Sequence, residues 1–443
     1  MSSRGATRRT AILWTGAVAT CGAVALIAFT GCPEADGESA DDPLQAALDA
    51  IPVGGTLMVD RAWTRSVSLA VRHGVTVAFT GAGAIRMSRD VDAIVVTASG
   101  VNVVNPVISG IGATATGRGH GIAVMGTAGE PLHDVRISGG RLRDLRHDGV
   151  HVEYCDAFVL ERTTISSVGY AGVSLVGVVD ALVQDTVVSD VRQPAGWPNS
   201  YGITVTRNAT TAVATTRRSS RIRILRNRVS GVPKWEGIDT HAGSDVEIRD
   251  NVVSGCRVGI AAVPSKAAAD PTTTDVAPTG LVVAGNVVTR TDALGVGSGI
   301  LVSGAGSTVG SDAPRATGSV TGNTVTGGGG TSAAGILVKL TSGFVIADNT
   351  VLSSAVDGIC LQHSNTGITV RGNRIRGVSG PSVAIDVRAG ANDGVIQDNR
   401  VEPSPKVRVG LRLGSPDNRF VVRGNAFAAA TVPEALGGAT ITR

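Results

Sequence analysis

The second half of the chain repeats one alternation of hydrophobic and polar positions at a nearly fixed period. Short runs with Val and Ile at every second position are broken by Gly, Asn, Asp and Ser, which are strand and turn signals. Each repeat carries two or three such runs, and no helical periodicity separates them. A period of roughly 20 to 50 residues is typical of a solenoid. The pattern therefore predicts a solenoid whose coils consist of strands alone.

Eight asparagines occupy the same position in successive repeats, 24 to 37 residues apart. Asn tolerates the left-handed conformation of turns, and stacked Asn side chains can form a hydrogen-bonded ladder. We therefore expect a structural ladder, formed by Asn227, Asn251, Asn286, Asn323, Asn349, Asn373, Asn399 and Asn425.

A glycine followed by an aliphatic residue marks a second position in most repeats, from Gly121 to Gly410. The aliphatic residue is expected to point into the core, and strand alternation then sends the second and fourth residues after the glycine outward. The first outward residues are, in chain order, Ala123, His151, Ser174, Thr204, Asp239, Ala261, Leu301, Leu337, Cys360, Asp386 and Arg412. Counting these markers and the earlier turns predicts about a dozen coils in a single domain over residues 43–443.

The start of the solenoid carries a recognisable cap. Residues 43–50 (PLQAALDA) predict a short amphipathic helix, and the strand VGGTLMV follows at 53–59. This combination resembles the N-terminal cap of pectate-lyase-like right-handed parallel β-helices. The resemblance implies an all-β, right-handed parallel β-helix with a short capping helix. Such a cap is needed because the first coil would otherwise expose its apolar end.

Residues 1–32 indicate an export signal. Arg8 and Arg9 lie in a phrase similar to a twin-arginine signal, before an uncharged apolar run at 11–31. The run ends in Phe-Thr-Gly-Cys, which resembles a bacterial lipobox and implies lipidation of Cys32. An uncleaved anchor and ordinary cleavage are the alternatives, since 21 apolar residues can span a bilayer.

Each of these alternatives leaves the rest of the chain outside the cytoplasm. We expect a membrane-anchored lipoprotein that faces the periplasm or the cell exterior and contacts the membrane through its N-terminal lipid. Residues 33–42 are polar and acidic and are expected to form a tether.

Composition narrows the function classes. Only 3% of the residues are aromatic and 17% are charged, while 59 are glycines, which suits a narrow, regular β core. The net charge of +4 comes from scattered residues, so no basic face with stacking aromatics is expected and nucleic-acid binding is disfavoured. The cysteines Cys155, Cys256 and Cys360 have no metal-binding spacing and are expected to be buried apolar fillers. We expect a monomer with no metal centre; calcium stays open, since Glu236 and Asp239 could contribute to a site.

One coil stands out for its chemistry, because Asp239 and His241 are its two outward residues and their neighbours are small or hydroxylated. Open space beside an acid–base pair suits a bound sugar chain. His241 can act as a base or an acid near neutral pH, and Asp239 can orient it.

The phrase WEGIDTH at 235–241, followed by SDVEIRDN, resembles the catalytic coil of mannuronan epimerases, which carries Tyr-Gly-Phe-Asp-Pro-His. In that family the Asp and the His act near the uronate, where the C-5 proton is removed and returned, and a Tyr assists. Asp239 and His241 match this motif, whereas Glu236 stands in place of the Tyr. Tyr201, one residue before the glycine of the preceding coil, could lie one strand spacing from Glu236 and supply the missing phenol.

Several neighbours are expected to bind substrate. Lys234 and Arg207 are cations that could meet a carboxylate, and Trp197 and Trp235 could stack on sugar faces. The full expected set of substrate-binding residues is Lys234, Trp235, Glu236, Arg207, Trp197, Thr204 and Thr206. A second polar group, Asp148, His151 and Glu153, is expected to be a solvated face, and Asp386 with Arg388 a surface ion pair.

These observations favour a polysaccharide lyase or epimerase acting on a uronic-acid-containing glycan. A non-catalytic β-helix that binds glycan or serves as a surface structural module is the alternative. A glycoside hydrolase using Glu236 and Asp239 as its two carboxylates is the third option.

Overall fold

The structure is a computed structural model. It describes residues 42–112, 118–192, 199–207, 216–265, 276–291, 294–306, 313–328, 333–354, 356–377, 382–403, 407–427, 434–435 and 440–442. The export signal, Cys32, the tether up to residue 41 and Trp197 lie outside these ranges. Within them, no helix is both long and apolar enough to cross a membrane.

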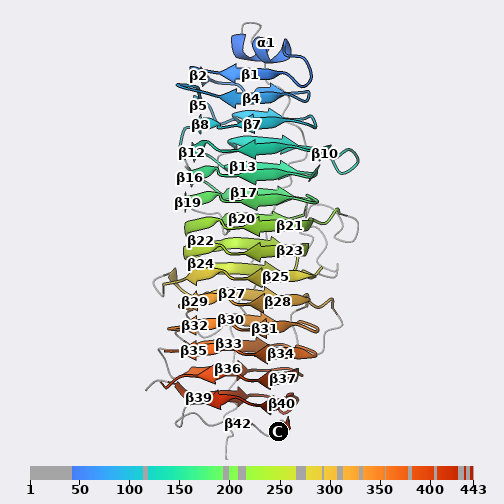
Figure 1. Cartoon of the computed structure of the whole chain (residues 1–443), viewed down its shortest axis with the longest axis vertical. Helices are drawn as coiled ribbons and strands as arrows, with labels where there is room; N and C mark the ends of the chain where they lie inside the picture. The colour runs from blue at the N-terminus through green and yellow to red at the C-terminus, as the bar shows by residue number, and fades with distance from the viewer. Residues whose placement is uncertain are drawn as a thin grey trace, which may run out of the picture.

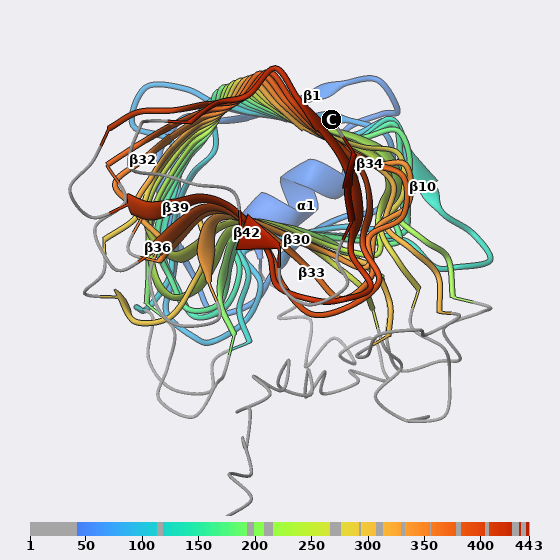
Figure 2. The same ribbon diagram turned by 90° about the horizontal axis from the view of Figure 1, so that it is seen from below.

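The chain winds into an elongated rod of stacked coils with α1 (Pro43–Asp49) at one end (Figure 1). Viewed along the axis, successive coils superimpose and leave three faces around a central core (Figure 2). In the described residues, each coil except the last contributes one strand to each face, and strands of neighbouring coils pair in parallel. The predicted parallel β-helix is confirmed, and its first face has 15 strands, slightly more than the expected dozen coils.

The strands fall into three faces. Face one contains β1 (Thr56–Val59), β4 (Thr76–Phe79), β7 (Asn102–Val104), β11 (Arg136–Ser138), β15 (Val159–Glu161), β18 (Leu182–Gln184), β21 (Ser220–Leu225), β23 (Ser244–Arg249), β25 (Leu281–Ala284), β28 (Gly318–Thr321), β31 (Val345–Ala347), β34 (Ile368–Arg371), β37 (Asp393–Gln397), β40 (Arg419–Arg423) and β43 (Thr440–Thr442). Face two contains β2 (Ala62–Arg65), β5 (Ala84–Met87), β8 (Val107–Ser109), β12 (Arg141–Leu145), β16 (Thr164–Val168), β19 (Val187–Val191), the first parts of β22 (Arg228–His241) and β24 (Val252–Val263), β26 (Val287–Thr289), β29 (Thr324–Thr326), β32 (Thr350–Leu352), β35 (Arg374–Arg376), β38 (Arg400–Val401) and β41 (Ala426–Phe427). Face three contains β3 (Leu69–Val71), β6 (Ile94–Val96), β9 (Ile122–Met125), β13 (Val150–Glu153), β17 (Ala171–Val176), β20 (Tyr201–Thr206), the last parts of β22 and β24, β27 (Ile300–Ser303), β30 (Ala334–Lys339), β33 (Asp357–Gln362), β36 (Ser382–Val387), β39 (Val407–Leu413) and β42 (Glu434–Ala435). A short pair, β10 (Leu132–His133) and β14 (Cys155–Asp156), lies beside them.

The core is a continuous column of aliphatic side chains. Each residue that follows the marker glycine of its coil, or Ala384 in its place, is fully buried, as the alternation predicts; these residues are Ile122, Val150, Val173, Ile203, Ile238, Ile260, Ile300, Ile336, Ile359, Ile385 and Leu411. The three cysteines are also buried and unpaired, as expected of apolar fillers. Aliphatic side chains of each coil therefore pack on the equivalent side chains of the next coil, which removes apolar surface from water along the rod.

The marker glycines are required by the close approach of neighbouring coils. A Cβ on Gly202 would lie 2.4 Å from the carbonyl oxygen of Gly237, and one on Gly237 would lie 2.7 Å from that of Gly259. Both distances are shorter than a carbon–oxygen contact allows, and a core valine side chain obstructs each position as well. The repeated glycines are thus explained by the close packing of neighbouring coils, which leaves no room for a side chain at these positions.

The asparagine ladder is continuous from Asn227 to Asn425. Asn286 is typical: its backbone N–H and its Nδ2 both donate to Asn323 Oδ1 at 2.9 Å, and Nδ2 also donates to the Ile248 carbonyl. A second ladder, which the sequence analysis missed, runs from Thr341 through Asn365 and Asn392 to Asn418 at another corner. Its members are 24, 27 and 26 residues apart but lack a repeated flanking phrase.

The cap closes the first coil as predicted. Leu44 and Leu48 of α1 are buried against the end of the core. Asp42, which was assigned to the tether, belongs to the cap instead, since its carboxylate accepts hydrogen bonds from the Leu44 and Gln45 N–H groups and pairs with Arg65. An N-capping carboxylate satisfies helix N–H groups that have no partner within the helix.

We expect Asn286→Ala to lower the free energy of unfolding by about 2–4 kcal/mol, because it leaves several buried donors and acceptors unpaired at once. Denaturant unfolding followed by circular dichroism measures this. Asn425→Ala, at the half-buried end of the same ladder, is the matched control and should cost less. Equal losses at the two positions would contradict the ladder's role.

Candidate functional site

The outward row of face three is stacked as the sequence predicted. The strand register pairs Thr204 with Asp239, Asp239 with Ala261, and so on to Asp386 and Arg412. Residues that are far apart in the sequence therefore form one file along the rod. Asp239 lies on the outer side of the sheet, since Ile238 and Thr240 of the same strand face the core side.

Tyr201, Asp239 and His241 converge on this face. His241 Nε2 lies 3.1 Å from Asp239 Oδ2 and 3.5 Å from the Tyr201 hydroxyl. Thr204 donates a hydrogen bond from its hydroxyl to Asp239 Oδ2 at 3.0 Å. Tyr201 pairs in register with Glu236, so the expectation that the two lie one strand spacing apart is confirmed. His241 thus contacts both of the other predicted acid–base groups.

Burial and charge set the protonation of this group. Burial alone would lower the pKa of His241, but the Asp239 carboxylate and a hydrogen bond to the Pro264 carbonyl raise it above its usual value. Burial raises the pKa of Tyr201 well above its usual value, and the neighbouring Tyr170, Glu236 and Asp239 raise it further. At neutral pH Tyr201 is therefore a neutral hydroxyl, and His241 holds its proton more tightly than a free imidazole.

The expected open furrow over the pair is not what the structure has. Asp239 is fully buried, Tyr201 and Glu236 are each 3% exposed, and 16% of the His241 side chain is accessible. Among the described residues, Asp239 Oδ1 is buried without a hydrogen-bond partner. A buried carboxylate oxygen in this state is suited to receive a donor from a ligand.

Glu236, Asp239 and His241 each offer a ligand atom within 4.8 Å of the others. Calcium prefers six to eight oxygen ligands. Glu236 and Asp239 could supply carboxylate oxygens toward that set, whereas the imidazole of His241 is not an oxygen ligand.

A second group of charged residues lies two to three coils away and is not the solvated face that was expected. Asp148 is fully buried, and its Oδ2 lies 2.9 Å from His151 Nδ1 while its Oδ1 accepts the Ala171 N–H at 3.0 Å. The opposite nitrogen of His151 lies 3.1 Å from Glu153. Although burial opposes the charge, these two carboxylates raise the pKa of His151 to about 10. Asp148 keeps a lowered pKa despite burial, because His147 and His151 surround it.

Aromatic rings connect the two groups. His147 and Tyr170 have ring centroids 4.8 Å apart, Tyr170 and Tyr201 5.6 Å, and Tyr201 and His241 6.0 Å. His120 stacks on His151 at 4.6 Å. Four of the seven histidines and two of the three tyrosines thus occupy one stripe.

Sequence reasoning missed His120, His147 and Tyr170 as members of this stripe. All three share one sequence signal, because each lies one or two residues before a marker glycine. These positions fall at the corner that leads into face three.

The remaining predicted substrate-binding residues are spread around the site. Lys234 is exposed, and Trp235 is half-buried under the Arg257 guanidinium, 5.1 Å from its ring centroid. Thr206 is half-buried at the end of β20. Arg207 is only 3% exposed and donates to the Thr216 carbonyl at 2.7 Å, so its guanidinium is directed at backbone. Thr204 acts on Asp239, as described above.

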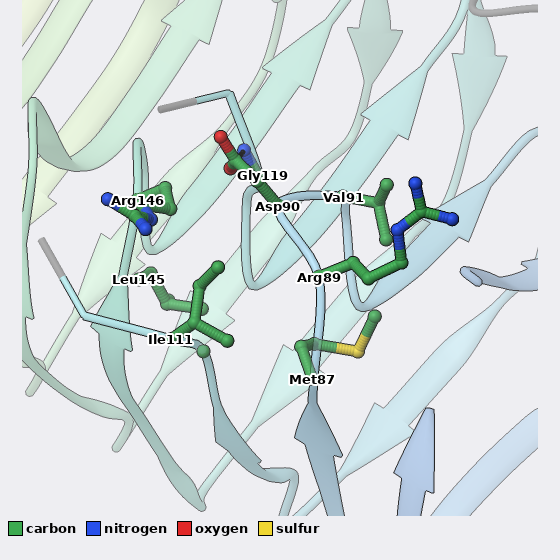
Figure 3. A pocket seen from close by; sticks show the side chains of 9 residues that line it. Met87, Arg89, Asp90, Val91, Ile111, Gly119, Leu145 and Arg146 are labelled. Carbon is green, nitrogen blue, oxygen red and sulfur yellow. Dashed lines mark hydrogen bonds between the residues drawn. The ribbon is translucent and has the colours of Figure 1, made fainter. Parts of the chain in front are cut away.

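A small cavity lies at the corner before this stripe, between Asp90, Val91, Ile111, Leu145 and Arg146 (Figure 3). Its volume is about 10 Å³. That is room for about one water molecule, which excludes it as a sugar site.

Comparison with known families agrees with this architecture. The family described as a right-handed beta helix region matches residues 92–312 and 282–427. The chain belongs to this family. No curated protein gave a significant match.

Solved structures with the same fold include proteins of known activity. A GH87 α-1,3-glucanase catalytic unit from Streptomyces thermodiastaticus superimposes with a TM-score of 0.52 at 13% identity, covering 89% of this chain and 65% of the glucanase. The A-module of a mannuronan C-5 epimerase from Azotobacter vinelandii gives 0.50 at 13%, covering 90% and 95%. A tailspike of the E. coli bacteriophage HK620, in complex with a hexasaccharide, gives 0.63 at 12%, covering 89% and 73%. At these identities the likeness shows the fold alone.

The pKa of His151 predicts how stability depends on pH. A histidine with a folded-state pKa of about 10 and an unfolded value near 6.5 stabilises the fold fully below pH 6.5, and this contribution is lost as pH rises toward 10. We therefore expect the midpoint temperature of thermal unfolding to decrease as the pH is raised from 7 to 10. Calorimetry measures this temperature.

The matched control is His151→Gln, which removes the titrating group and should flatten this pH dependence while lowering stability at pH 7. A pH dependence that is unchanged in the variant would assign the effect to other groups.

Proposed function

We propose that the protein is a lyase or epimerase that acts on a uronic-acid-containing polysaccharide, with Tyr201, Asp239 and His241 carrying the proton transfers. The observation that supports this most directly is the position of His241 Nε2, within 3.5 Å of both the Tyr201 hydroxyl and the Asp239 carboxylate. The glucanase and the epimerase with the same fold are named for polysaccharide reactions, and the tailspike holds an oligosaccharide, which supports the substrate class.

The chemistry of a uronate explains why these side chains suit the reaction. Both reactions begin when a base removes the proton at C-5, next to the carboxyl group. In epimerisation a second group returns a proton to the opposite face of the same carbon. In elimination the C-4 oxygen leaves instead, the C-4–C-5 double bond forms, and an acid protonates the leaving oxygen.

Each side chain has a role in this scheme. His241 in its neutral form accepts the C-5 proton, and Asp239 holds the imidazole and stabilises the imidazolium that results. Tyr201, kept protonated by its raised pKa, is the donor. Thr204 fixes Asp239 through its hydroxyl. The contact between Tyr201 and His241 lets a proton pass between the two groups after each turnover.

A glycoside hydrolase is the second candidate, because Glu236 and Asp239 bring two carboxylates into one cluster within 4.8 Å. Retaining glycosidases hold their carboxyl groups about 5 Å apart. A hydrolase would release reducing ends without forming an unsaturated product or exchanging the C-5 proton.

We also propose that residues 1–32 direct export and that Cys32 carries a lipid, so that the rod lies at the membrane surface outside the cytoplasm. The supporting observation is the succession of paired arginines, apolar run and Phe-Thr-Gly-Cys. Metabolic labelling with a fatty acid should mark the full chain and leave Cys32→Ser unlabelled.

Asp239→Asn, His241→Ala and Tyr201→Phe should each reduce turnover of a uronate polymer by about a hundredfold to ten-thousandfold, the usual contribution of a positioned acid or base. Absorbance of the unsaturated uronate measures elimination, and deuterium incorporation at C-5 measures epimerisation. Asp348→Asn, which removes an exposed ion pair with Arg371, is the control and should keep full activity. Wild-type activity in all three site variants would contradict the proposal.

The direction of the pH profile follows from the raised pKa of His241. Because the base must be neutral, turnover should rise as pH increases through a value above 6.5. In Asp239→Asn the midpoint of any residual activity should move to lower pH, since the charge that holds the proton is gone. Steady-state rates across pH 5 to 10 test this, and a midpoint that is unchanged in the variant would contradict the pairing.

A further inference from the structure

The outward row of face three contains a compact charged group near the C-terminal end of the rod. Asp386 of β36 is fully buried, and Arg412 of β39 is its register partner. Arg412 donates from Nε to Asp386 Oδ1 at 2.8 Å and from Nη2 to Oδ2 at 2.6 Å, a two-point contact. Arg388 donates to the same Oδ2 at 2.9 Å and also pairs with the buried Asp357. The expectation of a simple surface ion pair between Asp386 and Arg388 is therefore wrong.

This network borders a hollow of about 180 Å³, lined by Asp386, Arg388, Ala389, Arg412 and Gly414. Ala389 and Gly414 leave room there because their side chains are small or absent. The guanidinium groups remain partly accessible, with 37% of the Arg412 side chain and 20% of the Arg388 side chain exposed. The hollow is thus open to solvent and walled by two cations that buried carboxylates hold in place.

The hydrogen bonds of Arg412 leave one edge of its guanidinium for a ligand. A guanidinium carries five N–H donors in a planar fork that can contact a carboxylate along either of two edges. Arg412 uses the Nε edge for Asp386, and among the described residues its Nη1 makes no hydrogen bond. Asp357 and Asp386 balance the charges of Arg388 and Arg412, so the hollow offers an anion the free donor edge of Arg412 and no net positive charge. A planar anion is the ligand that this arrangement recognises best.

The hollow lies on the same row as the acid–base group. The row passes from Asp239 through Ala261, Leu301, Leu337 and Cys360 to Asp386, five coil steps, or about 24 Å at about 4.8 Å per coil. The four residues between the two ends carry no charge. On this row, a polyanion that extends beyond the acid–base group would meet its first cationic side chain at Arg412.

We propose that the hollow at Arg388 and Arg412 is a distal subsite that binds a carboxylate of an acidic glycan whose reacting residue lies at Tyr201, Asp239 and His241. The identity of the ligand rests on the proposed function, whereas the anion-binding character rests on the arginine network alone. The subsite selects for chain length, because a short oligosaccharide cannot reach from one end of the row to the other.

Binding of labelled oligogalacturonates and oligomannuronates to the full chain, in an Asp239→Asn background that prevents turnover, tests this subsite. A dodecamer of at least one series should bind more tightly than its tetramer. Arg412→Gln and Ala389→Trp should each weaken dodecamer binding about tenfold or more, as expected for the loss of a charge-assisted contact. Tetramer binding should not change.

Ala389→Trp is the decisive variant, because it fills the hollow from an exposed position and replaces no member of the ion-pair network. Its effect on binding therefore still tests the subsite if Arg412→Gln destabilises the last coils. A neutral maltododecaose is the matched ligand control and should be insensitive to both substitutions.

The subsite is overturned if no acidic dodecamer binds, or if both variants bind the dodecamer as tightly as the parent protein does. It is also overturned if the substitutions weaken binding of the neutral chain as much as binding of the acidic one. These results are separable from failure of the proposed function. Turnover of a uronate polymer with binding insensitive to the variants removes the subsite alone. Binding that is sensitive to the variants, without turnover in the native sequence, removes the catalytic proposal alone.

Discussion

The parallel stacking of coils in strict register is the constraint on which the rest of this structure depends. Once neighbouring coils pair residue for residue, every backbone corner must fit above its equivalent about 4.8 Å away. The glycines before the buried aliphatic residues allow this approach, since a Cβ at Gly202 or Gly237 would strike the next backbone. Two ladders of asparagines fix the corners by pairing each turn with the next. A slip by one residue would turn the core face outward, so the register is strongly specified.

The same register creates the candidate site from residues that are distant in the sequence. His151, Thr204 and Asp239 come from three separate coils, yet they occupy one row because stacked strands place equivalent positions above one another. Rings from the adjacent corner, including Tyr170 and Tyr201, join the row from the side. The result is a stripe in which acid, base and phenol groups are held by backbone geometry, which is the kind of preorganisation that catalysis requires.

Buried charge along this row is tolerated because each charge has partners. Asp148 has two histidines and a backbone N–H, and Asp386 has two arginines. Desolvating an unpaired carboxylate would cost several kcal/mol, whereas paired groups recover much of that cost. Asp239 differs, since one of its oxygens is buried without a partner in the described part of the chain. A destabilised group of this kind at a predicted reaction centre is consistent with a site completed by its ligand.

The sequence by itself determined the solenoid, its capping helix, the first asparagine ladder and the outward row, because each depends on local alternation repeated at a fixed period. It also brought Tyr201 to the neighbourhood of Glu236, since a one-coil offset follows from the glycine markers. Only the tertiary structure decided which outward positions are buried. Period-2 alternation places Asp239 on the outer face, but its exposure depends on what else packs there. The second ladder, the ring stripe through His147 and Tyr170, and the Asp357–Arg388–Asp386–Arg412 network likewise required coordinates, because they join corner and strand positions that share no repeated phrase.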